Sequence, residues 1–145
     1  MKWPWREVIG DPGDPLLVRY TLLWTPWVRV YIHKLCRSDR DRHLHDHPWS
    51  FVSVVLWSGY HEMRPGNEVV ERGPLSIAYR RAEDQHRVRL RQLMRVEYHG
   101  TTQTWHRVGE IPAWTLVICG RKRRLWGFET EEGWVESSQY FHREG

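Results

Sequence analysis

The sequence lacks the features that mark membrane-spanning, exported or disulfide-rich proteins. Its 145 residues contain no apolar run of 18 or more, which excludes an ordinary membrane-spanning helix. The N-terminal MKWPWREVIGDPGDP has neither the apolar stretch nor the small-residue cleavage site of a signal peptide, so we expect a cytoplasmic protein. The two cysteines, Cys36 and Cys119, are too few for a disulfide framework. We expect both to be buried thiols, Cys119 in particular.

Sustained helical periodicity and low-complexity segments are also absent. Instead, apolar and β-branched runs of strand length recur between Pro- and Gly-rich turn signals. The runs are 16–24, 28–35, 51–57, 75–79, 86–90, 93–98, 114–119 and 125–128. This spacing predicts one all-β domain over residues 1–145, either an antiparallel sandwich or a barrel. We expect residues 1–15 to form an N-terminal arm.

Charge and aromatic content leave several functions open. The net charge is +4, from 22 basic and 18 acidic residues, and part of the excess is local, at Arg80-Arg81 and at Arg121 to Arg124. Such runs can bind phosphate or nucleic acid, or they can be solvated turn residues. The ten tryptophans can fill a core or line a ligand cavity, and Trp3 and Trp5 could form a dimer interface.

A cluster of histidines carries the strongest chemical signal. His43, His45 and His47 precede the alternating run Phe51 to Leu56. Alternate side chains of an extended strand share one face, and imidazole is the commonest metal ligand in proteins. The segment therefore predicts a metal site, the alternative being a histidine-rich loop without metal. Pro48 cannot donate a backbone hydrogen bond, so we expect the strand to end or bulge there.

These residues resemble the cupin superfamily of small double-stranded β-helix (jelly-roll-like) barrels. The first cupin motif is H-x-H, three or four residues, Glu, six residues, Gly. Counting back from Gly59 assigns His45 and His47 to the histidine pair and puts Val52 where the glutamate is usual. The second motif supplies one further histidine, which falls on His86. Its usual glycine and proline are replaced by Arg81 and Glu83.

A narrower resemblance covers about Arg19 to Tyr140. The strings YIHKL, RSDRD, HDHPW-x-F, SGYHE, PAWTLVICG, RRLWGFET and EGWV are similar to those of a group of small cupin-like proteins from phages and bacteria. Two departures stand out. Ser58 replaces a usual glycine, and the segment 91–111, with His99 and His106, is longer and predicts an inserted hairpin.

The resemblance implies a divalent metal on His45, His47 and His86. His43 has the strand parity to face the same way and is an additional candidate. Without a glutamate at Val52, three neutral histidines would leave open positions and an uncompensated 2+ charge that attracts a polar or anionic small-molecule substrate. Such a site suits an Fe(II) dioxygenase or hydroxylase. With Zn, Mn or Ni it suits a lyase, an isomerase or a hydrolase. Fe(II) is our preferred metal.

Further residues are candidates for the same site. His33 and Tyr60 are candidates for proton transfer or substrate contact. Glu62 is the preferred general base or a replacement carboxylate ligand, because burial inside a barrel would raise the pKa of its carboxyl. The substrate-binding candidates are Trp126, Phe128 and Arg80. Asp46, of opposite parity to His45 and His47, is expected to bond a backbone amide or a neighbouring arginine.

The sequence thus favours a metal-dependent cupin enzyme. A non-catalytic ligand-binding barrel and a factor that binds or modifies nucleic acid are the alternatives, and a homodimer is possible in each case.

Overall fold

The computed structural model describes residues 5–143, and almost all of its regular structure is β-strand. The largest sheet has six strands, in the order β1-β2-β3-β11-β5-β8. Its members are β1 (Trp5–Asp11), β2 (Asp14–Trp24), β3 (Arg29–Leu35), β5 (Phe51–Trp57), β8 (Ile77–Arg80) and β11 (Ala113–Cys119). Every pairing is antiparallel, as the alternating apolar runs predict.

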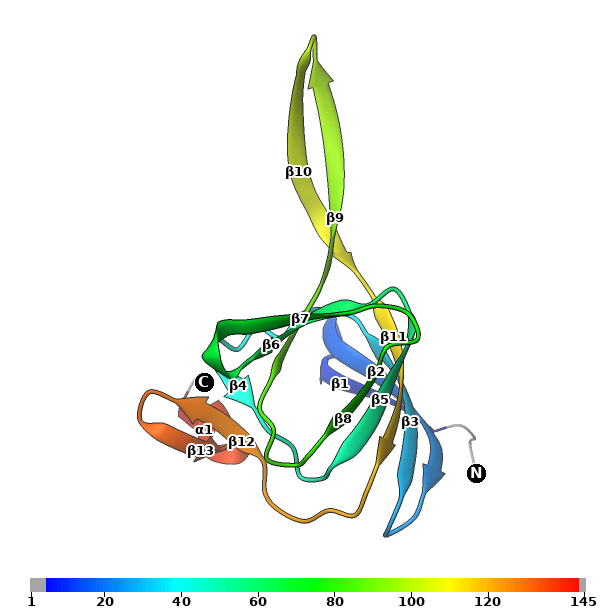
Figure 1. The fold of residues 1–145 in the computed structure, drawn as a ribbon, viewed down its shortest axis with the longest axis vertical. Coiled ribbons are helices and arrows are strands. Elements are labelled where there is room, and N and C mark those ends of the chain that lie inside the picture. Colours follow the sequence, from blue (N-terminus) through cyan, green and yellow to red (C-terminus); the bar gives the residue numbers. More distant parts are fainter. Residues whose placement is uncertain (1–4, 144–145) are drawn as a thin grey trace.

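A second sheet faces the first and closes the other side of the barrel (Figure 1). It has the order β10-β9-β6-β7 and contains β6 (Tyr60–Arg64), β7 (Glu68–Arg72), β9 (Arg87–His99) and β10 (Thr102–Ile111). A 3₁₀ turn, η1 (Pro65–Asn67), joins β6 to β7. The outer parts of β9 and β10 pair only with each other and project away from the barrel (Figure 1). This hairpin contains residues 91–111.

A third, small sheet adds the C-terminal segment to the side of the barrel. Its order is β13-β12-β4, with β4 (Leu44–His45), β12 (Gly127–Thr130) and β13 (Gly133–Glu136), and it is followed by the short helix α1 (Ser137–Arg143). Phe128, Val135 and Tyr140 form a buried cluster between this sheet and the helix. The pairing of β4 with β12 brings the histidine segment against the C-terminal part of the chain.

The turn between β5 and β6 explains a residue choice noted in the sequence. Ser58 has a φ of 64°, the left-handed conformation that glycine adopts at least cost, so a glycine is usual here for a conformational reason. At the next position Gly59 has a φ of 134°, and a Cβ there would lie 2.1 Å from the carbonyl oxygen of Arg72. Gly59 is therefore required by the close approach of β7.

The strand predictions hold in the centre of the barrel and miss its shorter elements. The run 51–57 coincides with β5, whereas 86–90 and 93–98 are parts of one long strand, β9. The N-terminal residues 5–11 form β1, paired with β2. Both cysteines are free thiols, Cys119 buried and Cys36 partly buried. No helix within residues 5–143 is long and apolar enough to cross a membrane.

Candidate metal centre

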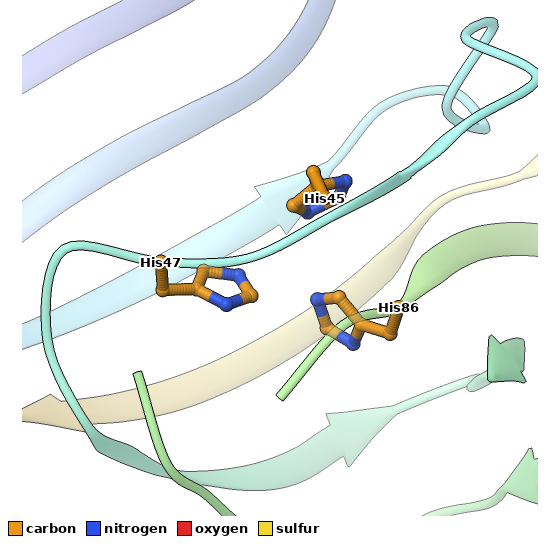
Figure 2. A group of neighbouring side chains, drawn as sticks. All are labelled: His45, His47 and His86. Atoms are coloured by element: carbon orange, nitrogen blue, oxygen red, sulfur yellow. The ribbon is translucent and has the colours of Figure 1, made fainter. Parts of the chain in front are cut away.

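Backbone pairing brings the first and second histidine motifs together. His45, at the end of β4, forms an isolated antiparallel bridge with His86, each backbone N–H donating to the other's carbonyl at 3.0 and 2.9 Å. Two residues later the N–H of His47 donates to the carbonyl of Ala82 at 3.0 Å. Segments about 40 residues apart in sequence are thus fixed side by side, with three imidazoles facing one another (Figure 2).

The three rings are close enough to share one ion. The centroid distances are 5.2 Å for His45–His47, 5.0 Å for His45–His86 and 4.8 Å for His47–His86. One nitrogen from each ring lies within 4.8 Å of the others, and no other described residue joins this group of potential ligands. This spacing suits a cation held by imidazole nitrogens at about 2 Å.

The protonation of these rings also favours a cation. Burial, with the neighbouring His86, lowers the pKa of His45 to about 4 and holds the pKa of His47 well below its ordinary value. Both imidazoles are therefore neutral at pH 7, the form that binds metal. Nδ1 of His47 is buried and has no hydrogen-bond partner among the described residues. A buried polar atom without a partner is costly, and an ion at the centre of the three rings fits this arrangement.

His86 is oriented by Glu62 on the side away from His45 and His47. Its Nδ1 lies 2.8 Å from Glu62 Oε1, so with an ionised carboxylate the imidazole hydrogen is on Nδ1 and Nε2 keeps its lone pair. Arg80 in turn donates two hydrogen bonds to the Glu62 carboxylate, from Nε to Oε1 at 2.7 Å and from Nη2 to Oε2. Arg72 Nε also donates to Oε2, at 2.9 Å. Carboxylates commonly fix ligand histidines in this way.

These contacts correct the expectations for Glu62 and Arg80. Burial alone raises the pKa of Glu62, but hydrogen bonds from His86 and Arg80 outweigh it and the pKa lies well below its ordinary value. Both carboxylate oxygens are already occupied, and Glu62 does not line the cavity, so it is not placed to be a general base or a metal ligand. Arg80 is buried against Glu62 and does not line the cavity.

His43 is also not placed to be a ligand. Its Nδ1 lies 3.0 Å from the Tyr140 hydroxyl and its Nε2 lies 3.0 Å from Glu131. The shared-face prediction fails because β4 covers only Leu44–His45, and His43 lies in the bend before it. His43 instead ties this bend to the C-terminal segment.

Asp46 has the structural contacts expected of it. Its carboxylate accepts hydrogen bonds from the Gly127 N–H at 2.7 Å, Arg124 at 2.6 Å and the Trp134 indole at 2.8 Å. These bonds fasten the loop between His45 and His47 to β12 and β13. The contacts of Glu62 and Asp46 could be found only from the tertiary structure. The sequence feature that could have pointed to them is a carboxylate close to a histidine motif.

The histidine group opens onto a cavity of about 460 Å³ inside the barrel. This volume is within the range of small-molecule sites. Trp126 and Phe128 line the cavity beside His45, with ring centroids at 6.3 and 6.0 Å. Tyr60 and Ser53 contribute hydroxyls to the wall, and burial raises the pKa of Tyr60, which keeps its proton. His33 faces the cavity from β3.

Other sequence candidates lie elsewhere on the molecule. Trp3 is outside the described residues, and Trp5 is exposed on β1. The basic runs are largely paired locally, Arg81 with Asp84, Arg123 with Glu83 and Arg124 with Asp46. His99 and His106 lie on the projecting hairpin, each beside Glu97.

Comparison with known proteins identifies the architecture. No family model and no curated protein matches the sequence. A cupin-2 domain protein from Rhodospirillum rubrum has a TM-score of 0.60 to this structure at 13% identity, over 100% of this chain and 86% of that one. The chain has the cupin fold.

Two further structural matches are to larger proteins. The DMSP lyase DddQ from Ruegeria pomeroyi has a TM-score of 0.57 at 14% identity, covering 86% of this chain and 57% of that chain. The Fe(II) protein HppE has a TM-score of 0.54 at 11% identity, covering 82% and 58%. At these identities the likeness is one of fold, and this chain covers little more than half of either protein.

Proposed function

We propose that this cupin is a metal-dependent enzyme that acts on a small polar or anionic molecule inside the barrel. The observation that carries the proposal is the group of three converging histidines on the wall of the cavity. His45, His47 and His86 would hold the ion. When bound, a divalent metal at such a site supplies either Lewis-acid or redox chemistry.

The protein's own groups have distinct roles in this proposal. Glu62 keeps the His86 hydrogen on Nδ1 and so presents Nε2 to the ion. The Tyr60 hydroxyl and the His33 imidazole face the cavity and can donate hydrogen bonds to substrate. Trp126 and Phe128 exclude water from the side next to His45.

Fe(II) is the first choice of metal, and an oxygenase or hydroxylase is the first choice of reaction. Three neutral ligands leave positions for substrate and dioxygen. Matches to an Fe(II) protein and to a lyase support testing both reaction classes. We also propose membership of the small phage and bacterial cupin-like group, on the strings that the chain shares with it.

The deciding experiment is elemental analysis of untagged protein, wild type beside His45→Ala and His47→Ala. His106→Ala is the matched control, since His106 is exposed on the hairpin. We expect one metal per chain in the wild type and in the control, and none in the other two variants. Bound iron would direct turnover tests to oxygen consumption, and zinc, manganese or nickel to lyase and isomerase reactions.

Two results would contradict the proposal. If the wild type binds no metal after reconstitution with Fe(II), Mn, Ni and Zn, the barrel is a metal-free ligand-binding module. If His45→Ala keeps its metal, the ion lies elsewhere. Nucleic-acid binding is less well supported, because the basic runs pair with nearby carboxylates.

A further inference from the structure

The cavity has a second polar region, away from the histidine group. Arg19 of β2 and His33 of β3 are register partners, and both line the cavity. The rings of Phe51 and Tyr31 lie between this pair and the metal centre. Phe51 contacts His47 with ring centroids 4.7 Å apart and packs against the cluster that contains Tyr31, and Tyr31 stacks on His33 at 5.6 Å.

The Arg19–His33 contact leaves hydrogen-bond donors for a ligand. Arg19 Nε donates to His33 Nε2 at 3.1 Å, which fixes the imidazole hydrogen on Nδ1. Within residues 5–143, one carboxylate lies near the terminal nitrogens of Arg19, that of exposed Glu7, at 3.6 Å from Nη1. That distance is too long for a hydrogen bond. The guanidinium lies over the Tyr31 ring, 4.6 Å from its centroid, which holds it against the wall.

We propose that Arg19 and His33 form a subsite for the carboxylate of a bifunctional substrate whose other end reaches the metal. The inference rests on the proposed function and adds the substrate class to it. One guanidinium supplies one positive charge, which matches one carboxylate, and the fork of N–H groups suits its two oxygens. The apolar rings of Phe51 and Tyr31 between the two polar ends favour a short carbon chain in the middle of the ligand.

The test uses Zn(II)-loaded full-length protein and a series of α,ω-dicarboxylates from malonate to adipate. Monocarboxylates of the same chain length are the comparison, and calorimetry measures the affinities. We expect one dicarboxylate of the series to bind at least about tenfold more tightly than its monocarboxylate. Arg19→Gln should abolish this preference without changing the zinc content.

Arg6→Gln is the matched control. Arg6 is the neighbour of Glu7 on β1 and pairs with Tyr20, so it lies one register position away on the opposite face of the sheet. The variant Arg6→Gln removes the same charge outside the cavity, and it should bind the dicarboxylates as the wild type does. Arg19→Lys keeps the charge without the fork, should retain part of the preference, and replaces Arg19→Gln if that variant does not fold.

An unchanged preference in Arg19→Gln, or no preference in the wild type, would overturn the subsite. Failure of the proposed function is distinguishable from this. If no metal binds, the same acids are titrated into metal-free protein and followed by NMR. Weak binding that disappears in Arg19→Gln would then uphold the carboxylate subsite alone, and unaltered or absent binding would refute it.

A separate observation concerns the outer face of the six-stranded sheet. The residues that alternate with the cavity-lining ones form two rows across five strands, and both rows are wholly apolar apart from the tyrosine hydroxyls. The first row is Ile77, Val54, Leu116, Ile32 and Tyr20. The second is Tyr79, Val52, Ile118, Val30 and Leu23. Ile77 is 67% exposed and Tyr79 61%.

We propose that a second copy of this chain covers the face in a two-fold dimer. With the flanking Trp57 and Trp114, the rows form a contiguous apolar patch in which Ile77, Tyr79 and Trp57 are each more than half exposed. Such a patch is typical of a protein–protein interface, which buries roughly 800 Å² on each partner in a stable complex. No residue within the two rows is charged; Arg6, which continues the first row on β1, and Lys34, beside Trp114, lie at their edges. The apolar face of one sheet can pack on the same face of a second copy, which is the requirement of a two-fold interface.

Light scattering on the full chain between about 1 and 100 μM tests this, the range spanning ordinary dimer affinities. We expect a dimer in the wild type and a monomer with unchanged metal content in Ile77→Lys/Tyr79→Lys. Trp105→Lys, on the exposed hairpin, is the control and should remain dimeric. A monomeric wild type, a dimeric double variant, or dissociation of the control alone would each refute the interface.

Discussion

At the scale of single residues, the candidate site depends on groups that the metal would not touch. Glu62 binds His86, Arg80 and Arg72 together, and its carboxylate is nearly inaccessible to solvent. Val52, at the usual position of the cupin glutamate, faces outward from β5. The carboxylate associated with this centre is therefore that of Glu62, on the next strand, β6. It contacts a histidine and would not contact the ion.

Glu62→Gln should lower both stability and metal affinity. The change leaves the buried Arg80 and the partly buried Arg72 without their counter-charge. Removing one partner of a buried ion pair costs about 3–5 kcal/mol. Loss of the contact to His86 should weaken metal binding by about 10- to 100-fold. Urea unfolding and competition with a chelator measure the two effects, with Glu71→Gln on exposed β7 as control. Complete loss of metal from a folded Glu62→Gln would instead identify Glu62 as a ligand.

The buried neutral histidines predict a pH dependence of the metal-free protein. Burial, with Arg19 nearby, lowers the pKa of His33 to about 3, and burial lowers that of His45 to about 4, from the ordinary 6.5. Above pH 6.5 these histidines bind no proton in either the folded or the unfolded protein. Below it the unfolded chain takes up protons that the folded chain excludes, so stability falls as the pH drops from about 6.5 towards 4.

Urea unfolding of chelator-treated protein at pH 7.5, 6.0 and 5.0 would detect this loss. His33→Asn should reduce the change in the free energy of unfolding between these pH values, whereas the exposed His106→Gln should not. A free energy of unfolding that stays constant from pH 7.5 to 5.0 would contradict the burial of neutral imidazoles.

At the scale of elements, the barrel and the projecting hairpin are separable. β9 pairs with β6 only through Arg87 to Leu90, and beyond this point its partner is β10. Such a two-stranded ribbon contributes little to the stability of the rest of the protein.

Replacing residues 95–106 with Asn-Gly should therefore leave the barrel intact. We expect the free energy of unfolding to change by less than about 1 kcal/mol, because no barrel contact is removed. Metal content should equal that of the wild type. A large loss of stability, measured by urea unfolding, would mean that the hairpin supports the barrel.

At the scale of the whole molecule, the metal would link three parts of the chain. His45 and His47 come from the segment around β4, which is paired with β12, and His86 precedes β9. A ligand that binds only the folded state stabilises it by RT ln(1 + [L]/Kd), about 2.7 kcal/mol at 100 times Kd. The melting temperature should rise by about 5–10 °C for a chain of this size.

Thermal melts with and without added metal test this, and His47→Ala should show no rise. An equal rise in that variant would indicate binding outside the three-histidine site.

The sequence alone determined the fold class and the identity of the central histidines. Alternating apolar runs specify strands because side-chain direction reverses at every residue, and H-x-H before such a run is a local pattern. His45 and His47 are therefore readable from their spacing. His86 needed the family resemblance, since nothing in its own surroundings marks it. The runs also located β5 and the core of β3 and β11, where burial on the cavity face is strongest.

Only the tertiary structure decided what each polar side chain faces. The His45–His86 bridge, the pairing of Glu62 with Arg80 and the ties of His43 to Tyr140 and Glu131 join residues 18 to 97 positions apart. Such contacts depend on the register between strands that the chain brings together by long connections. The ordinary expectation that burial raises a carboxyl pKa failed at Glu62 for the same reason. Its charge is fixed by partners on other strands, which no local pattern in the sequence encodes.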